Sequence, residues 1–134
     1  MSDNGLVTLA SAHDFATTLA RLTAALTAKG ITIFGQVDHA AGAAGVGLAL
    51  RPTTLVMFGN PKGGTPLMQV AQTAGIDLPL KALVWQDEGG AVRLSYNDPA
   101  WIAARHGLGA AAQPAVAGLS AALAAFAGQA TGTS

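Results

Sequence analysis

The stretch FGNPKGGTPLMQ, residues 58–69, decides how the middle of this chain folds, because an apolar run breaks there into glycine and proline. The preceding residues, Thr53 to Phe58, are typical of a strand. Thr65 followed by Pro66 matches an N-cap and a first helical position, so we expect a helix to begin there and Gly75 to close it. The stretch therefore predicts a strand, a glycine-rich turn and a helix.

Hydrophobic periodicity predicts the elements on either side of this turn. The predicted strands cover residues 6–9, 31–37, 80–86 and 91–96, and the predicted helices cover residues 12–29, 98–106 and the segment from 113 onward. Asp87-Glu88-Gly89-Gly90 is a strong hairpin signal between two of these strands. Residues 40–50, AAGAAGVGLAL, fit a helical turn by their alanines and argue against a long helix by their glycines.

This order of elements, with its hairpin and short connections, predicts an α+β fold. We expect a two-layer sandwich, in which a mixed, mostly antiparallel sheet of about five strands carries helices packed on one face. The length of 134 residues favours one domain, which we place at 1–128, with a disordered tail at 129–134.

The composition excludes several classes of protein. Seven basic and seven acidic residues cancel, which argues against a nucleic-acid binder. The chain has no cysteine, so disulfides and thiolate chemistry are excluded. Few charges and many small apolar residues suggest a surface buried against a second subunit, and we expect a homo-oligomer, most simply a dimer.

The uncharged segment after Gly107 raises the question of a membrane span. It contains glutamine, proline, glycines and mostly alanine, and Leu119, Leu123 and Phe126 form one stripe of a core helix. We therefore expect no membrane contact. The first residues lack the pattern of a secretory signal, which predicts a cytoplasmic protein.

Five short strings in order and spacing resemble the domain-of-unknown-function family 302. They are VDHA at 37–40, FGNPKGGTPLM at 58–68, DLPLK at 77–81, YNDP at 96–99 and RHGL at 105–108. The resemblance extends from about Phe15 to Leu108. It implies a compact, self-associating α+β domain and no established activity.

The glycine-rich turn is a candidate anion site. Backbone amides of Gly63 and Gly64, together with the helix start at Thr65 and the charge of Lys62, would receive a carboxylate. The alternative is a purely structural turn in which both glycines adopt positive φ. The order of the lysine and the glycines excludes a Walker A loop.

His39 and His106 are candidate axial ligands of a non-covalent haem, and His39 is preferred because His106 ends a helix. A divalent metal site at Asp38, His39 and Asp77 is a weaker hypothesis, since no paired histidine spacing supports it. Tyr96 is expected to line a ligand cavity with its polar tip.

These features predict a non-catalytic domain that binds a small apolar ligand with an acidic group, with haem as the most concrete candidate. One alternative is a small hydrolase or isomerase that uses Asp38 and His39 as acid and base. Another is a structural dimerisation domain without a ligand. The haem hypothesis requires His39 and the Lys62 turn to border one common hollow.

Overall fold

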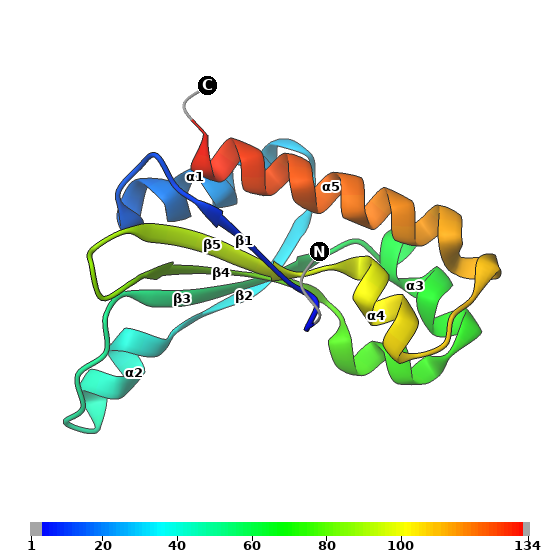
Figure 1. Cartoon of the computed structure of the whole chain (residues 1–134), viewed down its shortest axis with the longest axis horizontal. Coiled ribbons are helices and arrows are strands. Elements are labelled where there is room, and N and C mark those ends of the chain that lie inside the picture. Colours follow the sequence, from blue (N-terminus) through cyan, green and yellow to red (C-terminus); the bar gives the residue numbers. More distant parts are fainter. Residues whose placement is uncertain (1–3, 133–134) are drawn as a thin grey trace.

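The computed structural model describes residues 4–132, which form one α+β domain (Figure 1). The elements are β1 (Leu6–Ala10), α1 (Phe15–Ala28), β2 (Thr32–Asp38), α2 (His39–Gly45), β3 (Thr53–Gly59), α3 (Pro61–Val70), η1 (Gln72–Asp77), β4 (Leu80–Gln86), β5 (Val92–Asn97), α4 (Pro99–Arg105), η2 (Ala110–Ala112) and α5 (Gln113–Thr131). The η elements are short 3-10 helices. The predicted alternation of strands and helices is confirmed.

The five strands form one sheet in the order β1-β5-β4-β3-β2, and every neighbouring pair is antiparallel. The expected α+β class and strand number are thus confirmed, and the described strands include no parallel pair. The predicted hairpin joins β4 to β5. Its turn is fixed by Asp87, whose carboxylate accepts hydrogen bonds from Gly89 N at 3.0 Å and Ala91 N at 2.9 Å, and Gly90 has a φ of 89°.

Helices α1 and α5 cover one face of the sheet, as predicted (Figure 1). Alternate strand residues point toward them, so Val56, Phe58 and Leu94 are fully buried. The rings of Phe58 and Phe126 meet edge to face, with 6.3 Å between their centroids. This helix-covered face holds the main hydrophobic core.

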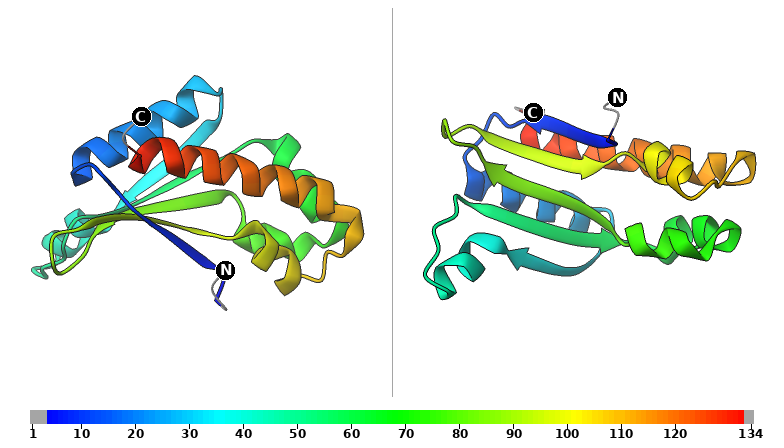
Figure 2. Two further views of the ribbon diagram at one scale, coloured as in Figure 1. Left: turned by 45° about the horizontal axis from the view of Figure 1, so that its top comes forward. Right: turned by 60° about the horizontal axis from the view of Figure 1, so that its bottom comes forward.

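The opposite face of the sheet has no helix lying across it among the described residues, as the right view of Figure 2 shows. We call it the open face. Strand register places on it Val37, Leu55, Met57, Leu83, Trp85 and Ser95. Four of these side chains are half-buried although no helix covers them: Leu55, Met57, Leu83 and Trp85. The open face therefore presents apolar side chains to its surroundings.

A second, smaller core lies beyond one end of the sheet, where α3, η1, α4 and η2 pack together (Figure 1). It contains Leu67, Ala74, Ala103, Leu108 and Val116. We call this smaller core the end cluster. The long helix α5 connects the two cores, since its first half packs into the end cluster and its second half covers the sheet. The end cluster provides one side of the candidate site.

The disordered tail was predicted to begin at residue 129, which is too early in the sequence. Helix α5 continues to Thr131, and Ala130 and Thr131 are buried. The carbonyl of Thr131 accepts a hydrogen bond of 2.8 Å from Ala12 N, and its hydroxyl donates to Ala127 O at 2.8 Å. Residues 129–131, which were expected to be disordered, are thus part of α5, and Thr131 is held against the β1–α1 connection. Residues 133–134 lie outside the described residues.

The ambiguous segment forms an arm, which we define as residues 39–50. It begins with α2, capped by Asp38, whose carboxylate accepts a hydrogen bond of 2.9 Å from Ala41 N. No residue of α2 is buried, and the arm leaves the sheet on the side of the open face (Figure 1). The helical turn expected from the alanines is present and short.

Candidate functional site

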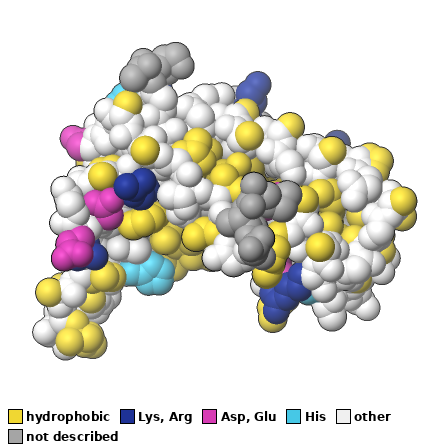
Figure 3. Space-filling view, in the orientation of Figure 1, with side chains coloured by type: hydrophobic (Ala, Val, Ile, Leu, Met, Phe, Trp, Pro, Cys, Tyr) yellow, Lys and Arg dark blue, Asp and Glu magenta, His cyan; other side chains and the backbone are white. Residues whose placement is uncertain are grey.

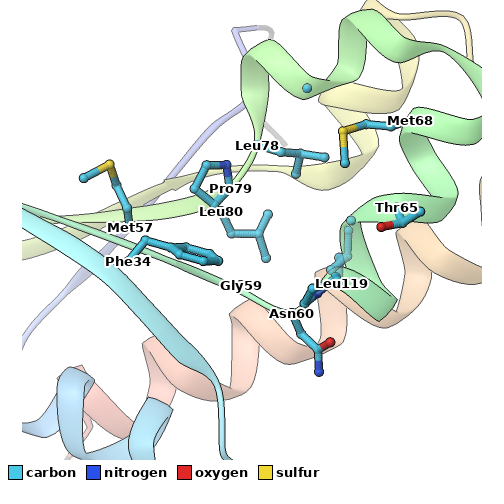
Figure 4. Close-up of a pocket in the computed structure, with 13 residues that line it drawn as sticks. Phe34, Met57, Gly59, Asn60, Thr65, Met68, Leu78, Pro79, Leu80 and Leu119 are labelled. Atoms are coloured by element: carbon cyan, nitrogen blue, oxygen red, sulfur yellow. The ribbon is translucent and has the colours of Figure 1, made fainter.

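A cavity of about 550 Å³ lies where the ends of β2, β3 and β4 meet α3, η1 and α5 (Figure 4). Phe34 and Met57 line it from the sheet, and Met68 and Leu78 line it from the end cluster. Leu119 of α5 contributes to the wall as well. The volume lies within the range of about 300–1,000 Å³ that is common for pockets in proteins, and the lining is mainly apolar.

The local sequence explains why space remains there. Gly59, Gly64 and Gly75 line the cavity without side chains. The register of β2 shifts between Ile33 and Gly35, and the intervening Phe34 lies across Gly59, where an added Cβ would be 3.5 Å from its ring. A strand irregularity and missing side chains thus form the cavity.

The glycine-rich stretch forms the first turn of a helix. Helix α3 begins at Pro61, four residues earlier than predicted, because Asn60 caps it by accepting a 2.9 Å hydrogen bond from Lys62 N. The amides of Gly63 and Gly64 donate to the carbonyl of Asn60 at 2.8 and 3.2 Å. The expected N-cap at Thr65 was therefore wrong, and the glycine amides that were expected to receive a carboxylate donate within the first turn of the helix.

Gly63 and Gly64 are instead residues of helix α3, where they lie close to Leu119 and Leu78, respectively. Neither has positive φ, contrary to the alternative of a left-handed turn. A Cβ at Gly63 would lie 3.0 Å from Leu119, so Gly63 permits α3 to approach α5 closely. Gly64 and Thr65 face the cavity, whereas Lys62 is exposed and lies outside its wall.

His39 lies far from this cavity. Thr32 pairs with Gly59 at the cavity end of β2, and Asp38 pairs with Thr54 at the other end. Six residues of strand place His39 about 20 Å from the cavity end, at roughly 3.3 Å per residue. The common hollow that the haem hypothesis required is therefore absent.

The structure does not support the other roles expected for His39. Asp38 is engaged as the cap of α2, and His39 is exposed at the first position of that helix. The described residues contain no group of three or more histidine and carboxylate side chains arranged to hold a metal ion. A cap carboxylate and an exposed imidazole on an arm do not form an enclosed acid–base site.

His106 is part of a buried polar cluster. Its Nε2 lies 2.6 Å from Asp77 Oδ2 and its Nδ1 lies 3.0 Å from the hydroxyl of Thr73. The side chains of His106 and Asp77 are only 7% and 12% exposed. Arg105 Nη1 donates to both oxygens of Asp77, at 3.0 and 3.1 Å. Both ring nitrogens are occupied, so the cluster joins η1 to the end of α4 and leaves no nitrogen for a ligand.

Tyr96 also lies away from the cavity. It faces the helix-covered side of the sheet and is buried in the main core, where burial raises the pKa of its hydroxyl. Trp85 lies on the open face and donates from Nε1 to Ser95 Oγ at 2.9 Å. Of the sequence-predicted site residues, the structure places Gly64 and Thr65 in the cavity wall.

This architecture is that of a family without an assigned activity. The sequence model described as "Domain of unknown function DUF302" matches residues 7–126, and the chain belongs to this family. A crystal structure of an uncharacterized conserved DUF302 protein from Bacillus stearothermophilus superimposes with a TM-score of 0.81, covering 94% of this chain and 98% of that one. Its sequence identity is 19%, so this likeness shows the fold alone.

Curated relatives carry a different name. Two proteins called fluoride-specific ion channel FluC 1, from Brucella suis and Brucella abortus, are 50% identical over 114 residues. The match covers 85% of this chain but 45% and 42% of those proteins. The chain thus spans less than half the length of the curated relatives that it matches.

Proposed function

We propose that this domain binds a small apolar molecule, with a polar or acidic group, in the cavity between the sheet end and α3. The observation that carries the proposal is the apolar cavity of about 550 Å³, which falls within the usual range of ligand sites. Thr65 and Asn60 are polar residues in its wall and would orient the polar end of a ligand.

The chemistry of the wall argues against a bare anion. The nearby glycine amides already donate to Asn60, and the other wall residues are mainly aliphatic, aromatic or thioether side chains. A desolvated anion needs donors or a paired cation, which these side chains do not provide. An apolar body with one polar group fits better.

Haem becomes a less favoured ligand than the sequence suggested. Neither His39 nor His106 lines the cavity, so a bound haem would have only the sulfurs of Met57 and Met68 as side-chain ligands there. A hemin titration therefore belongs in the test. The hydrolase alternative rested on Asp38 and His39, and the geometry gives it no support.

We further propose that fluoride conduction in the longer relatives belongs to the part of their chains beyond the match. Helical channels cross the membrane with segments of about 20 apolar residues. Among the described residues one helix, Ala110–Thr131, passes that test of length and composition, and it supplies Leu123 and Phe126 to the core of this domain. The matched part would then be an accessory ligand-binding domain, and its cytoplasmic location stays a prediction.

The test is a fluorescence titration with 1-anilinonaphthalene-8-sulfonate, an apolar dye that carries one acidic group. Gly64→Leu would fill the cavity, since a Cβ at Gly64 meets Leu78 at an ordinary contact of 3.5 Å and the helix tolerates the side chain. We expect the affinity to fall by about tenfold or more, which corresponds to at least ~1.4 kcal/mol of binding free energy.

The matched control is Gly118→Leu, because Gly118 is an exposed helical glycine with no atom within 4 Å of an added Cβ. This variant should bind the dye like the wild type. Equal dye affinity in both variants, or no saturable binding of dye or hemin by the wild type, would refute the proposed function.

A further inference from the structure

The buried polar cluster between η1 and α4 ends in an exposed hydroxyl group. Nδ1 of His106 lies 3.0 Å from Oγ1 of Thr73, and Thr73 is an exposed residue of η1. The other ring nitrogen lies 2.6 Å from the carboxylate of Asp77, and the side chains of His106 and Asp77 are both largely buried. A hydroxyl, an imidazole and a carboxylate in this order form the arrangement by which proteins activate a nucleophilic hydroxyl group.

The carboxylate determines which nitrogen of the imidazole carries the proton. Asp77 is an acceptor, so Nε2 of His106 holds the ring proton and donates it. Nδ1 then presents its lone pair to Thr73, whose hydroxyl donates to it. In this tautomer the imidazole is placed to remove the hydroxyl proton, which turns Oγ1 of Thr73 into a nucleophile.

Further contacts hold the imidazole and the carboxylate in one orientation. Arg105 donates to both oxygens of Asp77, at 3.0 and 3.1 Å, and its guanidinium lies 5.9 Å from the ring centroid of Trp101. The backbone of His106 is fixed as well, because its amide donates to the carbonyl of Ile102 at 3.2 Å where α4 ends. Such support is what a preorganised reactive group requires.

The hydroxyl is accessible and lies outside the ligand cavity, since neither Thr73 nor His106 belongs to the cavity wall. Figure 3 shows a group of basic side-chain atoms at the lower edge of the molecule near α4, and the side chain of Arg105, the last residue of α4, is 48% exposed. Side chains three positions apart on a 3-10 helix lie one above the other, so Ile76, which is 72% exposed, stands beside Thr73. An incoming molecule would thus meet a nucleophile next to an apolar side chain.

We propose that Thr73 is a nucleophile that accepts a short apolar acyl group from an activated ester, with His106 as its general base. Oγ1 of Thr73 attacks the carbonyl carbon of the ester, and the hydroxyl proton passes to Nδ1 of His106. The bond to the leaving oxygen breaks with its electron pair, and that oxygen takes the proton from the imidazolium. This activity goes beyond the proposed ligand site and does not depend on it, so the failure of either one leaves the other standing.

The test is the rate at which single hydroxyl groups of the full chain are acylated by 4-nitrophenyl butyrate. The reaction is quenched with acid within the first turnover, and peptide mass spectrometry measures the butyryl group at Thr73 and at Thr27 in the same sample. Thr27 is the internal reference, because it is an exposed threonine of α1 whose hydroxyl meets no imidazole among the described residues. We expect Thr73 to react about 100-fold faster or more, which is the contribution of a positioned general base.

Variants separate the effect of the base from the effect of exposure. His106→Gln removes the base, so the rate at Thr73 should fall to that at Thr27, whereas Thr73→Ser keeps the hydroxyl and should keep the fast rate. The matched control Thr27→Val should leave the rate at Thr73 unchanged. Equal rates at Thr73 and Thr27 in the wild type would overturn the proposal, whether or not His106→Gln folds. A folded His106→Gln protein that reacts at the wild-type rate would overturn it as well.

Discussion

Replacing His106 with alanine is expected to lower the free energy of unfolding by about 2–4 kcal/mol. The variant loses a 2.6 Å hydrogen bond to the Asp77 carboxylate and a 3.0 Å hydrogen bond to Thr73. A hydrogen bond to a charged group contributes about 1.5–3 kcal/mol and a neutral one about 0.5–1.5 kcal/mol. Asp77 keeps its two contacts with Arg105, so the loss should stay below that of a fully unpaired buried carboxylate.

Urea unfolding followed by circular dichroism measures this loss. His39→Ala is the matched control, because His39 is exposed on the arm and its removal should change stability by less than about 0.5 kcal/mol. Since the cluster holds η1, which contributes Gly75 to the cavity wall, His106→Ala should also weaken dye binding. Equal unfolding free energies for the two variants would show that the cluster is not the connection between η1 and α4 that the structure indicates.

Two further predictions concern turns of the chain. Gly5→Ala should lower the free energy of unfolding by about 2–4 kcal/mol, because φ at Gly5 is 77° and the new Cβ would overlap the ring of Trp101. Gly30 has a φ of 70°, but no atom lies within 4 Å of an added Cβ. Gly30→Ala should therefore lower the free energy of unfolding only by the ~1–2 kcal/mol of the left-handed conformation. The hydrogen bond from Arg93, followed by backbone amides, holds the pKa of Asp87 below its ordinary 3.8, so the stabilisation from its ionised form is present above that value and is lost as the pH falls through the lowered pKa. Asp87→Asn should therefore unfold with a flatter pH dependence below about pH 4, and an acid dependence identical to the wild type would contradict this assignment.

Much of the fold was predictable because local patterns agreed with the tertiary structure. Strand β4 has the predicted boundaries, and the Asp87–Gly90 turn forms the expected hairpin. The start of α3 was misplaced because Thr65-Pro66 and Asn60-Pro61 both match a cap followed by proline. Asn60 forms the cap, and Gly63 in the first turn of α3 permits a close approach to Leu119 of α5, a contact that is not visible in a single sequence.

The candidate site was less predictable. Thr65 and Gly64 were identified for an anion site and instead line an apolar cavity. The pairing of Asp77 with His106 joins residues 29 positions apart, and each lies in one of the strings that resemble the family. Contacts of that range depend on how η1 and α4 pack, so sequence spacing alone gives no signal for them.

The most direct test of the ligand site is a methyl spectrum of protein labelled with 13C at its methionine methyl groups. Met57 and Met68 line the cavity from the sheet and from α3, respectively, and single substitutions to leucine would assign their signals. On titration with the dye, both signals should shift along one binding curve, and the Gly64→Leu variant should move that curve to higher dye concentration. A dye that binds while both methionine signals stay in place would contradict the account.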